Sequence, residues 1–305
     1  MKTSVIIPTY NGAHKIFHVL EGLKKQSIKP DEIIVVIDGS TDNTEAVAEG
    51  FKTQLPQLRT VLQSNRGRAE VRNRGADEAE GPLLLFLDDD ILPGVDWIAA
   101  HIKHHQLHAE SILTSSATEP SSMAHTDFQK FKVHLSKRWI KDLVLLNKKQ
   151  FSKKNVFITA ANFSIPKAVF NRIGGFDKIL NDGEDFDFAV RATNLDVPVF
   201  FDADAFAWHL EKITCVHLIK RIRSYEQAGV ILLQTKPEIY GSFFSGRSDK
   251  AKTVKSQIFR LFCFKFWIRS IDKEWWVWMP KAIRFKLYDL VLTANAIYFP
   301  NSVKI

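Results

Sequence analysis

Short apolar runs alternate with amphipathic stretches along roughly the first ninety residues of the chain. Four apolar or β-branched runs fit strands: residues 4–8, 32–38, 60–63 and 82–88. In the first amphipathic stretch, Ile16, Leu20 and Leu23 recur at helical spacing. Strands that alternate with helices of about ten to fifteen residues indicate βαβ units and a parallel sheet. Because the strands are almost continuously apolar, we expect an α/β fold whose sheet is covered by helices on both faces.

The pattern is less regular after residue 95. Residues 95–150 are mostly helical in pattern, and residues 156–170 return to strand character before a helix start. Residues 171–192 fit a loop and then a helix, and residues 198–209 are again strand-like. From residue 211 onward, helical patterns rich in Lys, Arg, Phe and Trp dominate.

Charge divides the chain into two parts. The 305 residues carry a formal net charge of +8, which splits into −2 for residues 1–210 and +10 for residues 211–305. Such an asymmetry indicates parts with different partners. We therefore expect one domain over residues 1–210 and a basic, aromatic helical extension over residues 211–305.

Cysteine content and hydropathy bear on the compartment. Cys215 and Cys263 are the two cysteines, which are too few for a disulfide framework and favour a reducing compartment. No apolar run reaches the length of about 18 residues expected of a membrane span, and the N-terminal apolar run is too short for a signal peptide. We expect a cytoplasmic protein.

Polar residues follow each predicted strand. They occupy residues 9–12, 38–44, 64–73 and 88–90. Ligands of α/β sheets bind beyond the carboxyl ends of the strands, so we expect these segments to line one edge.

Three consecutive aspartates, Asp88, Asp89 and Asp90, follow the fourth strand. In an extended chain, Asp88 and Asp90 face one side and Asp89 faces the other. Hard oxygen ligands at a strand end suit Mg²⁺ or Mn²⁺, and a bound cation removes the objection that the carboxylates repel one another. The alternative is a solvated acidic turn.

Asp38 ends the second strand, where it is suited to accept a hydrogen bond from a base or a ribose. The alternative is helix capping, which accounts for residues 40–43 better than for Asp38. After the first strand, Pro8 is expected to end the ladder because it cannot donate to it. Asn11 is suited to cap the next helix, and Tyr10 to stack on a base.

Several motifs together resemble glycosyltransferase family 2, which has the GT-A fold. They are "VIIPTYN" (5–11), "EIIVVIDGSTDNT" (32–44), "NRGRAEVRNRGADEAEGPLLLFLDDD" (65–90) and "FSIPKAVFNRIGGFDKILNDGEDFDFAVRA" (163–192). The resemblance covers about residues 3–210. It implies a Rossmann-like, mostly parallel sheet, a nucleotide-diphosphate sugar as donor, a divalent cation, and inversion at the anomeric carbon.

The resemblance also implies roles for single residues. The nucleotide-sugar site would comprise Pro8, Thr9, Tyr10, Asn11, Asp38, Arg72, Asp88 and Asp89. Asp90 and His209 would hold Mn²⁺ or Mg²⁺. Asp185, next to Glu184 in "GEDFDF", falls at the position of the catalytic base, and Gly174, Gly175 and Phe176 would form a tight turn near the donor sugar.

A single base is chemically sufficient for inverting transfer. One carboxylate takes the proton of the acceptor hydroxyl, while a cation neutralises the leaving diphosphate. If Asp185 begins a helix, the helix dipole favours its charged form. The alternative for Glu184 and Asp185 is acidic capping of that helix.

Two further stretches have structural interpretations. "HIKHHQLH" (101–108) has histidines at i,i+4, a spacing that can bind zinc, but without a third ligand we expect a solvated helix face. The basic stretch at residues 130–149 faces either the acceptor or solvent. Processive members of the family carry a Q-x-x-R-W motif after the position of Asp185, and its absence here favours non-processive transfer.

Residues 256–299 combine aromatic and basic side chains, which suits peripheral contact with a membrane surface and a lipid-linked acceptor. The alternative is that these helices pack on the catalytic domain. No nucleic-acid-binding module is recognisable, so we expect no nucleic-acid partner.

The sequence therefore predicts a metal-dependent, inverting, non-processive glycosyltransferase at the cytoplasmic face of the cell membrane, with a UDP-sugar favoured as donor and a saccharide or lipid-linked acceptor. Two alternatives stay open. One is a catalytically inactive sugar-nucleotide-binding protein, and the other is a receiver-like or phosphoryl-transfer α/β protein.

Overall fold

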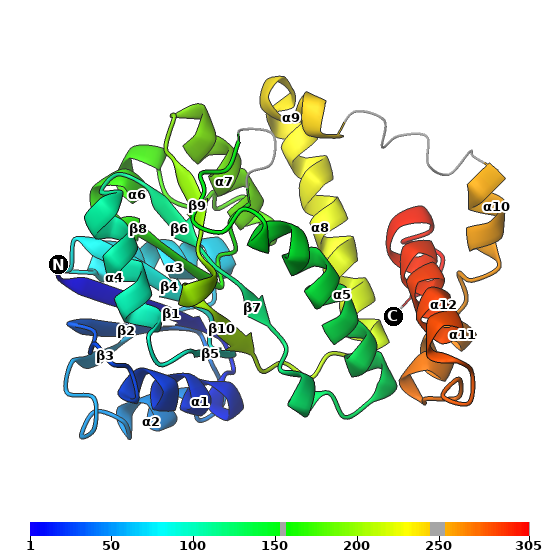
Figure 1. The fold of residues 1–305 in the computed structure, drawn as a ribbon, viewed down its shortest axis with the longest axis horizontal. Helices are drawn as coiled ribbons and strands as arrows, with labels where there is room; N and C mark the ends of the chain where they lie inside the picture. Colours follow the sequence, from blue (N-terminus) through cyan, green and yellow to red (C-terminus); the bar gives the residue numbers. More distant parts are fainter. Residues whose placement is uncertain (153–156, 245–253, 305) are drawn as a thin grey trace. The chain divides into compact units, whose positions relative to one another are not determined.

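The computed structural model describes residues 1–152, 157–244 and 254–304 (Figure 1). The chain divides into two compact units. The first comprises residues 1–120 and 137–211, and the second comprises residues 121–136 and 212–305. The boundary near residue 211 lies beside the one expected from charge, but the second unit also takes residues 121–136, which the sequence assigned to the first domain.

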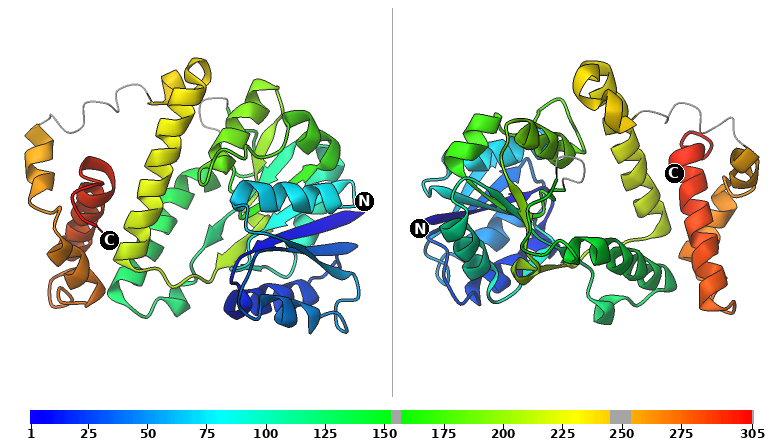
Figure 2. Two further views of the ribbon diagram at one scale, coloured as in Figure 1. Left: turned by 180° about the vertical axis from the view of Figure 1, so that it is seen from behind. Right: turned by 45° about the horizontal axis from the view of Figure 1, so that its top comes forward.

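A mixed sheet forms the centre of the first unit (Figures 1 and 2). Among the described residues it has seven strands, in the order β3 (Leu58–Gln63), β2 (Glu32–Asp38), β1 (Thr3–Thr9), β4 (Leu83–Leu87), β8 (Asn162–Pro166), β6 (Ile112–Thr114) and β9 (Val199–Phe201). Strand β8 pairs antiparallel with β4 and β6, and the other neighbours pair parallel. The sheet is therefore mostly parallel, as predicted.

Alternate residues of the strands enter two separate cores. Ile6, Ile34 and Phe86 belong to one buried cluster, whereas Val5 and Ile33 belong to the other. The first cluster includes residues of α3 (Arg68–Glu78), α6 (Lys167–Ile173) and α7 (Glu184–Asn194). The second includes residues of α1 (Ala13–Lys24), α2 (Thr44–Glu49) and α4 (Trp97–Leu107). Helices thus cover both faces, and the predicted α/β architecture is confirmed.

The expectation that Pro8 ends the first strand is wrong. Strand β1 continues to Thr9, and Pro8 pairs in register with Val36 of β2. On the other side, the pairing with β4 stops at Ile6. The β1–β4 ladder therefore makes no demand on the backbone nitrogen of residue 8, and a proline is tolerated in a central strand.

Residues 95–150 contain more strand than the pattern predicts. Besides α4, they hold β6, β7 (Ala117–Thr118), the 3₁₀ turn η1 (Ser121–Met123) and α5 (Asp127–Val144). Strand β6 is only three residues long, too short for a period of two to be recognised.

A smaller sheet has the strand order β5 (Ile91–Pro93), β10 (Ala207–His209) and β7. The short 3₁₀ turn η2 (Ala203–Ala205) precedes β10. Strand β10 runs antiparallel to β5, with His209 opposite Ile91. This register brings His209 next to the end of the aspartate triplet.

The histidines of α4 are buried, so the expected solvated helix face is wrong. The side chains of His101 and His105 both lie within hydrogen-bond distance of the Ser164 hydroxyl, at 2.7 Å and 2.8 Å. His104 Nε2 lies 2.8 Å from Ser111 Oγ. Burial lowers the pKa of His101 and of His105 to about 3 and that of His104 to about 4. These imidazoles are structural and uncharged at neutral pH.

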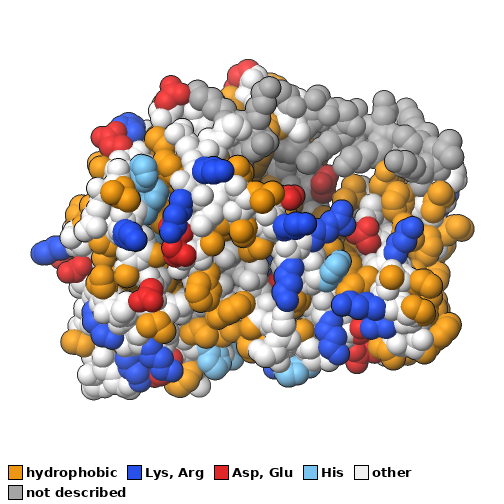
Figure 3. Space-filling view, in the orientation of Figure 1, with side chains coloured by type: hydrophobic (Ala, Val, Ile, Leu, Met, Phe, Trp, Pro, Cys, Tyr) orange, Lys and Arg blue, Asp and Glu red, His pale blue; other side chains and the backbone are white. Residues whose placement is uncertain are grey.

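The second unit is helical, as predicted for the C-terminal part. Its described helices are α8 (Cys215–Thr235), α9 (Pro237–Phe244), α10 (Val254–Arg260), α11 (Lys265–Asp272), α12 (Lys281–Thr293) and a π-helix η4 (Ala294–Tyr298), with the start of α5. Asp127 accepts hydrogen bonds from Arg284 and from the Tyr288 hydroxyl, which ties α5 to α12. Hydrophobic and basic side chains lie side by side on its surface (Figure 3). No helix in the described ranges has both the length and the apolar composition to cross a membrane.

We predict that the buried His101, His104 and His105 lower the free energy of unfolding of the first unit as the pH falls below 6.5, the ordinary pKa of histidine. The raised pKa values of Asp89, Asp185 and His209 act in the opposite direction. The unfolded chain binds protons on His101, His104 and His105 that the folded chain cannot accept. At pH 5 this costs about 2 kcal/mol for each histidine. Thermal unfolding of the wild type and of a variant that lacks one of these histidines, between pH 7.5 and pH 5, measures the contribution of that histidine.

His104→Phe should remove about 2 kcal/mol of the pH-dependent destabilisation at pH 5, because Phe keeps an aromatic ring against Phe200 but binds no proton. His18→Gln removes an exposed histidine and is the control. A loss of the same size in His104→Phe and in the wild type would contradict the interpretation.

Candidate active site

Four neighbouring parallel strands, β3, β2, β1 and β4, end at one edge of the larger sheet. The segments after them include Tyr10, Asn11, Asp38 and the aspartate triplet, as the sequence predicts. Tyr10 is half exposed and presents its ring to solvent.

The three aspartates pair with three positive groups, one of which, Lys15, lies near both Asp89 and Asp90. Strand β4 ends at Leu87, and residues 89 and 90 lie in a turn. The alternation expected of an extended chain therefore does not apply, and Asp88 and Asp90 do not share a partner among the contacts described here.

Asp88 accepts a hydrogen bond from Arg72. The distance from Arg72 Nη2 to Asp88 Oδ1 is 2.6 Å, and the other terminal nitrogen, Nη1, lies 2.6 Å from Glu184 Oε1. Although burial opposes it, the two carboxylates raise the pKa of Arg72 and hold it charged. A buried guanidinium thus joins α3, the end of β4 and the start of α7.

Asp89 points toward α1. Its Oδ2 accepts a hydrogen bond of 2.7 Å from Thr9 Oγ1, and its Oδ1 lies 3.6 Å from Lys15 Nζ. Burial raises the pKa of Asp89 to about 6, against the opposing effect of Lys15. A Cβ on Gly12 would lie 2.1 Å from Thr9 Oγ1, so this contact requires glycine at position 12. Lys15 was not singled out in the sequence.

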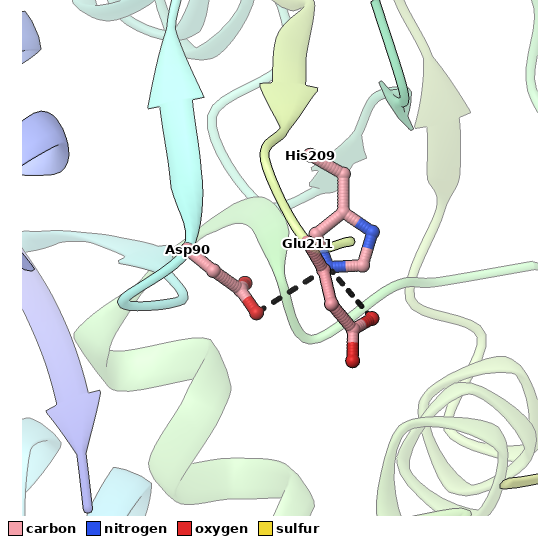
Figure 4. Close-up of side chains that lie close together, drawn as sticks. All are labelled: Asp90, His209 and Glu211. Atoms are coloured by element: carbon pink, nitrogen blue, oxygen red, sulfur yellow. Dashed lines mark ion pairs between the residues drawn. The ribbon is translucent and has the colours of Figure 1, made fainter. Parts of the chain in front are cut away.

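Asp90 meets His209 and Glu211 (Figure 4). His209 Nε2 lies 3.4 Å from Asp90 Oδ2 and 3.6 Å from Glu211 Oε2. Its other ring nitrogen lies 3.8 Å from Glu119 Oε1. Although burial opposes it, contacts with Asp90 and Glu119 raise the pKa of His209 to about 9.

The trio Asp90, His209 and Glu211 fits a divalent cation. One ligand atom from each side chain lies within 4.8 Å of the others, and among the described residues no other such trio of His, Cys, Asp and Glu occurs. Carboxylate oxygens with one imidazole nitrogen suit Mn²⁺ or Mg²⁺. The sequence pointed to Asp90 and His209 but missed Glu211 and Glu119. The spacing of Glu211 two residues after His209, at a strand end, was the available signal.

Asp185 is the second residue of α7, after Gly183, whose φ is +71°. Its Oδ1 accepts a hydrogen bond of 2.8 Å from the backbone N–H of Phe186. Burial and the charge of Glu184 raise the pKa of Asp185 to about 7, while Arg72 acts in the opposite direction. The helix dipole was expected to favour the charged form, but burial and the neighbouring carboxylate prevail.

Asp38 is buried and bonds to protein donors. Its Oδ1 accepts from Gln63 Nε2 at 2.7 Å and from the N–H of Arg66 at 2.8 Å, and its Oδ2 accepts from the N–H of Gly67 at 2.9 Å. The carboxylate therefore holds the loop that leads into α3.

Asn11 does not cap α1, so that expectation is wrong. Its φ is +48°, and its side-chain oxygen accepts a 2.8 Å hydrogen bond from the N–H of Thr41. The N–H of Asn11 bonds to the Ser40 hydroxyl, and that of Ala13 to Asp42. The polar residues after β2 thus fix the loop after β1, rather than only capping their own helix.

Gly174 and Gly175 form the expected tight turn, with φ of +91° and +68°. A Cβ on Gly175 would lie 2.8 Å from Asn73 Oδ1. Asn73 bonds to both the N–H and the carbonyl of Phe176. The turn therefore serves to pack the buried Phe176 ring against the core.

A family model for "Glycosyl transferase family 2" matches residues 4–174. The chain belongs to this family. Among curated relatives, a validoxylamine A glucosyltransferase of Streptomyces hygroscopicus subsp. limoneus is 28% identical over 233 residues, which cover 68% of this chain and 51% of the relative. The chain spans only 26% to 66% of the length of the first curated relatives that it matches.

Solved structures show the GT-A fold expected of family 2. The mannosyltransferase PcManGT of Pyrobaculum calidifontis, in complex with GDP-Man and Mn²⁺, aligns with a TM-score of 0.62 at 16% identity, over 99% of this chain and 88% of its own. S. aureus TarS 1–349 with UDP-GlcNAc aligns with a TM-score of 0.56 at 20% identity, over 97% and 90%. The likeness at these identities concerns the fold.

We predict that Arg72→Met destabilises this family 2 domain by about 3–5 kcal/mol, because the buried Glu184 is left without its partner and the partly exposed Asp88 loses its ion pair. Urea unfolding measures the change. Arg74→Met on the same helix is the matched control, since Arg74 makes only an exposed pair with Glu78, worth at most about 1 kcal/mol. Equal losses of unfolding free energy for the two variants would show that the ion pairs of Arg72 stabilise the domain no more than the pair of Arg74 does.

Proposed function

We propose that the protein is an inverting, non-processive glycosyltransferase. It moves a sugar from a nucleotide-diphosphate sugar to a hydroxyl of a saccharide or lipid-linked acceptor. The observation that carries the proposal is that the first unit holds both a possible cation site and a candidate general base. Asp90, His209 and Glu211 form a cation-binding set, and Asp185 is a carboxylate with a pKa near 7.

Asp185 is proposed as the general base. A base works best when its pKa is near the working pH, because it is then both deprotonated and a strong enough acceptor. The acceptor oxygen attacks the anomeric carbon from the side opposite the leaving group, its proton passes to Asp185, and the bond to the diphosphate breaks. Glu184 is proposed to support this role by holding the start of α7 to Arg72.

Asp90, His209 and Glu211 are proposed to hold Mn²⁺ or Mg²⁺. A bound divalent cation would offset the charge of the leaving diphosphate. The Mn²⁺ in the PcManGT complex supports a cation in this fold. Binding at His209 requires its neutral form, so the proton that the neighbouring carboxylates stabilise must leave first.

The donor is proposed to be a UDP-sugar, a choice supported by the UDP-GlcNAc complex of TarS. Tyr10 is proposed to stack on the base, and Pro8, Thr9 and Asn11 to shape the nucleotide loop. Asp38 and Arg72 bond to protein groups here, so we propose that they act on the nucleotide by positioning the loop before α3 and the carboxylate of Asp88. Asp89 is proposed to hold the nucleotide loop after β1 through its hydrogen bond with Thr9.

The place of action is proposed to be the cytoplasmic face of the cell membrane. The net charge of +10 over residues 211–305 supports attraction to anionic lipid.

We predict that UDP raises the thermal unfolding temperature of the protein and that Mn²⁺ increases the effect. The test is a thermal-shift panel of nucleoside diphosphates with and without Mn²⁺. Asp90→Asn should lose the Mn²⁺-dependent part, whereas Glu110→Gln, at an exposed side chain, should keep it. If no nucleotide stabilises the protein, the donor assignment is wrong, and an Mn²⁺ effect that survives in Asp90→Asn would contradict the cation site.

We predict that Asp185→Asn lowers kcat by roughly 10²–10⁴-fold, because the amide cannot take the acceptor proton. Stabilisation by UDP should persist in this variant. In the wild type, kcat/KM should fall as the pH drops below about 7, the pKa of Asp185. An assay of sugar transfer to a soluble acceptor, in which the released UDP is quantified, measures both effects. Stabilisation by UDP in a wild type that transfers no sugar would favour an inactive binder, and full transfer by Asp185→Asn would refute the base assignment.

A further inference from the structure

The turn between α11 and α12 exposes large apolar side chains. Trp278 is 76% exposed, and Trp275 and Val277 are each about half exposed. Phe266 on α11 is also about half exposed, and its ring contacts that of Trp275 at 5.9 Å between centroids. We call Phe266, Trp275, Val277 and Trp278 the aromatic tip. Contiguous exposed apolar groups of this kind mark a contact surface, whereas single exposed residues do not.

The backbone and inner side of the aromatic tip are fixed by hydrogen bonds. The N–H of Trp275 bonds to the Ser270 carbonyl, and the indole of Trp276 bonds to the Ser270 hydroxyl at 2.8 Å. Arg284 donates to the carbonyls of Val277 and Met279. The turn is therefore held in one shape while its large side chains point away from the core.

Basic residues outnumber acidic ones in the segment that contains the aromatic tip. Residues 258–286 carry a net charge of +5, and six of their basic side chains are exposed: Arg260, Lys265, Arg269, Lys273, Lys281 and Lys286. The two acidic residues in this range are occupied by the fold. Asp272 accepts from the N–H of Cys215, and Glu274 accepts from the N–H of Asp127. The surface thus offers apolar and positive groups together.

We propose that the aromatic tip docks the protein on an anionic phospholipid surface, with Trp275 and Trp278 inserted at the level of the headgroups and the surrounding lysines and arginines on the phosphates. Indole rings favour the membrane interface, and basic residues are attracted to an anionic leaflet. Charge complementarity favours lipid over a second copy of this chain, whose tip would carry the same positive charge. The inference deepens the proposed location and rests on it, but docking does not require sugar transfer.

Co-sedimentation with phosphatidylcholine vesicles that contain phosphatidylglycerol tests the proposal. The wild type should bind these vesicles and bind pure phosphatidylcholine far more weakly. Trp275→Ser/Trp278→Ser should bind at least tenfold more weakly, because two large side chains lose their apolar contact. Lys273→Gln/Lys281→Gln should bind about 25-fold more weakly, since each basic residue near an anionic surface contributes roughly fivefold.

Trp139→Ser is the matched control, because Trp139 is a half-exposed tryptophan outside the aromatic tip, and it should bind like the wild type. Thermal unfolding with UDP shows whether each variant is folded and keeps the nucleotide site, which separates failure of docking from failure of the proposed reaction. Vesicle binding that is unchanged in both double variants would overturn the proposal. The proposal would also be overturned if the wild type does not bind anionic vesicles but forms a dimer, and if Trp275→Ser/Trp278→Ser dissociates that dimer.

Discussion

The arrangement of the acidic groups in the first unit depends on the ion pairs that the buried guanidinium of Arg72 makes with Asp88 and Glu184. The guanidinium carries its charge with almost no access to water and meets that cost by bonding to Asp88 on one side and to Glu184 on the other. Removing either carboxylate would leave an unbalanced charge in the interior. The position of Asp185 follows from this bridge, because Asp185 is the next residue after Glu184 and shares its helix start. The proposed base is therefore tied to the end of β4.

The same balance explains how three adjacent aspartates are tolerated. Positive groups come from three elements: Arg72 of α3 pairs with Asp88, Lys15 of α1 lies near both Asp89 and Asp90, and His209 of β10 lies beside Asp90. The turn after Leu87 makes this divergence geometrically feasible, since an extended chain would have aimed two carboxylates the same way. Three positive groups thus offset the repulsion within the triplet. Among the three aspartates, Asp90 is the one that lies with further ligand atoms suited to a cation.

Features with a local pattern were predictable from the sequence, and features that depend on tertiary packing were not. The four strands before residue 90, three of them with nearly continuous apolar runs, appear within two residues of their expected bounds. The three-residue strand β6 has no readable period, and its place between β8 and β9 is set by the sheet. Burial of His101 and His105 depends on a serine 63 and 59 residues away, which spacing along α4 cannot reveal. Pro8 was misjudged because the extent of each ladder is a tertiary property.

Glu184 and Asp185 are neighbours in different electrostatic surroundings. Glu184 bonds directly to Arg72, whereas the pKa of Asp185 is raised, and the role proposed for Asp185 depends on this difference. Glu184 accepts a hydrogen bond from Arg72, and its carboxylate lies beside Asp185. The charge of that carboxylate, together with burial, makes protonation of Asp185 easier and outweighs the stabilisation expected at a helix N-terminus. A carboxylate with an ordinary pKa near 3.9 would be ionised at neutral pH but would be a weaker proton acceptor. Burial and the neighbouring Glu184 carboxylate therefore raise the pKa of Asp185 further than Arg72 lowers it, and this balance supports the base that we propose.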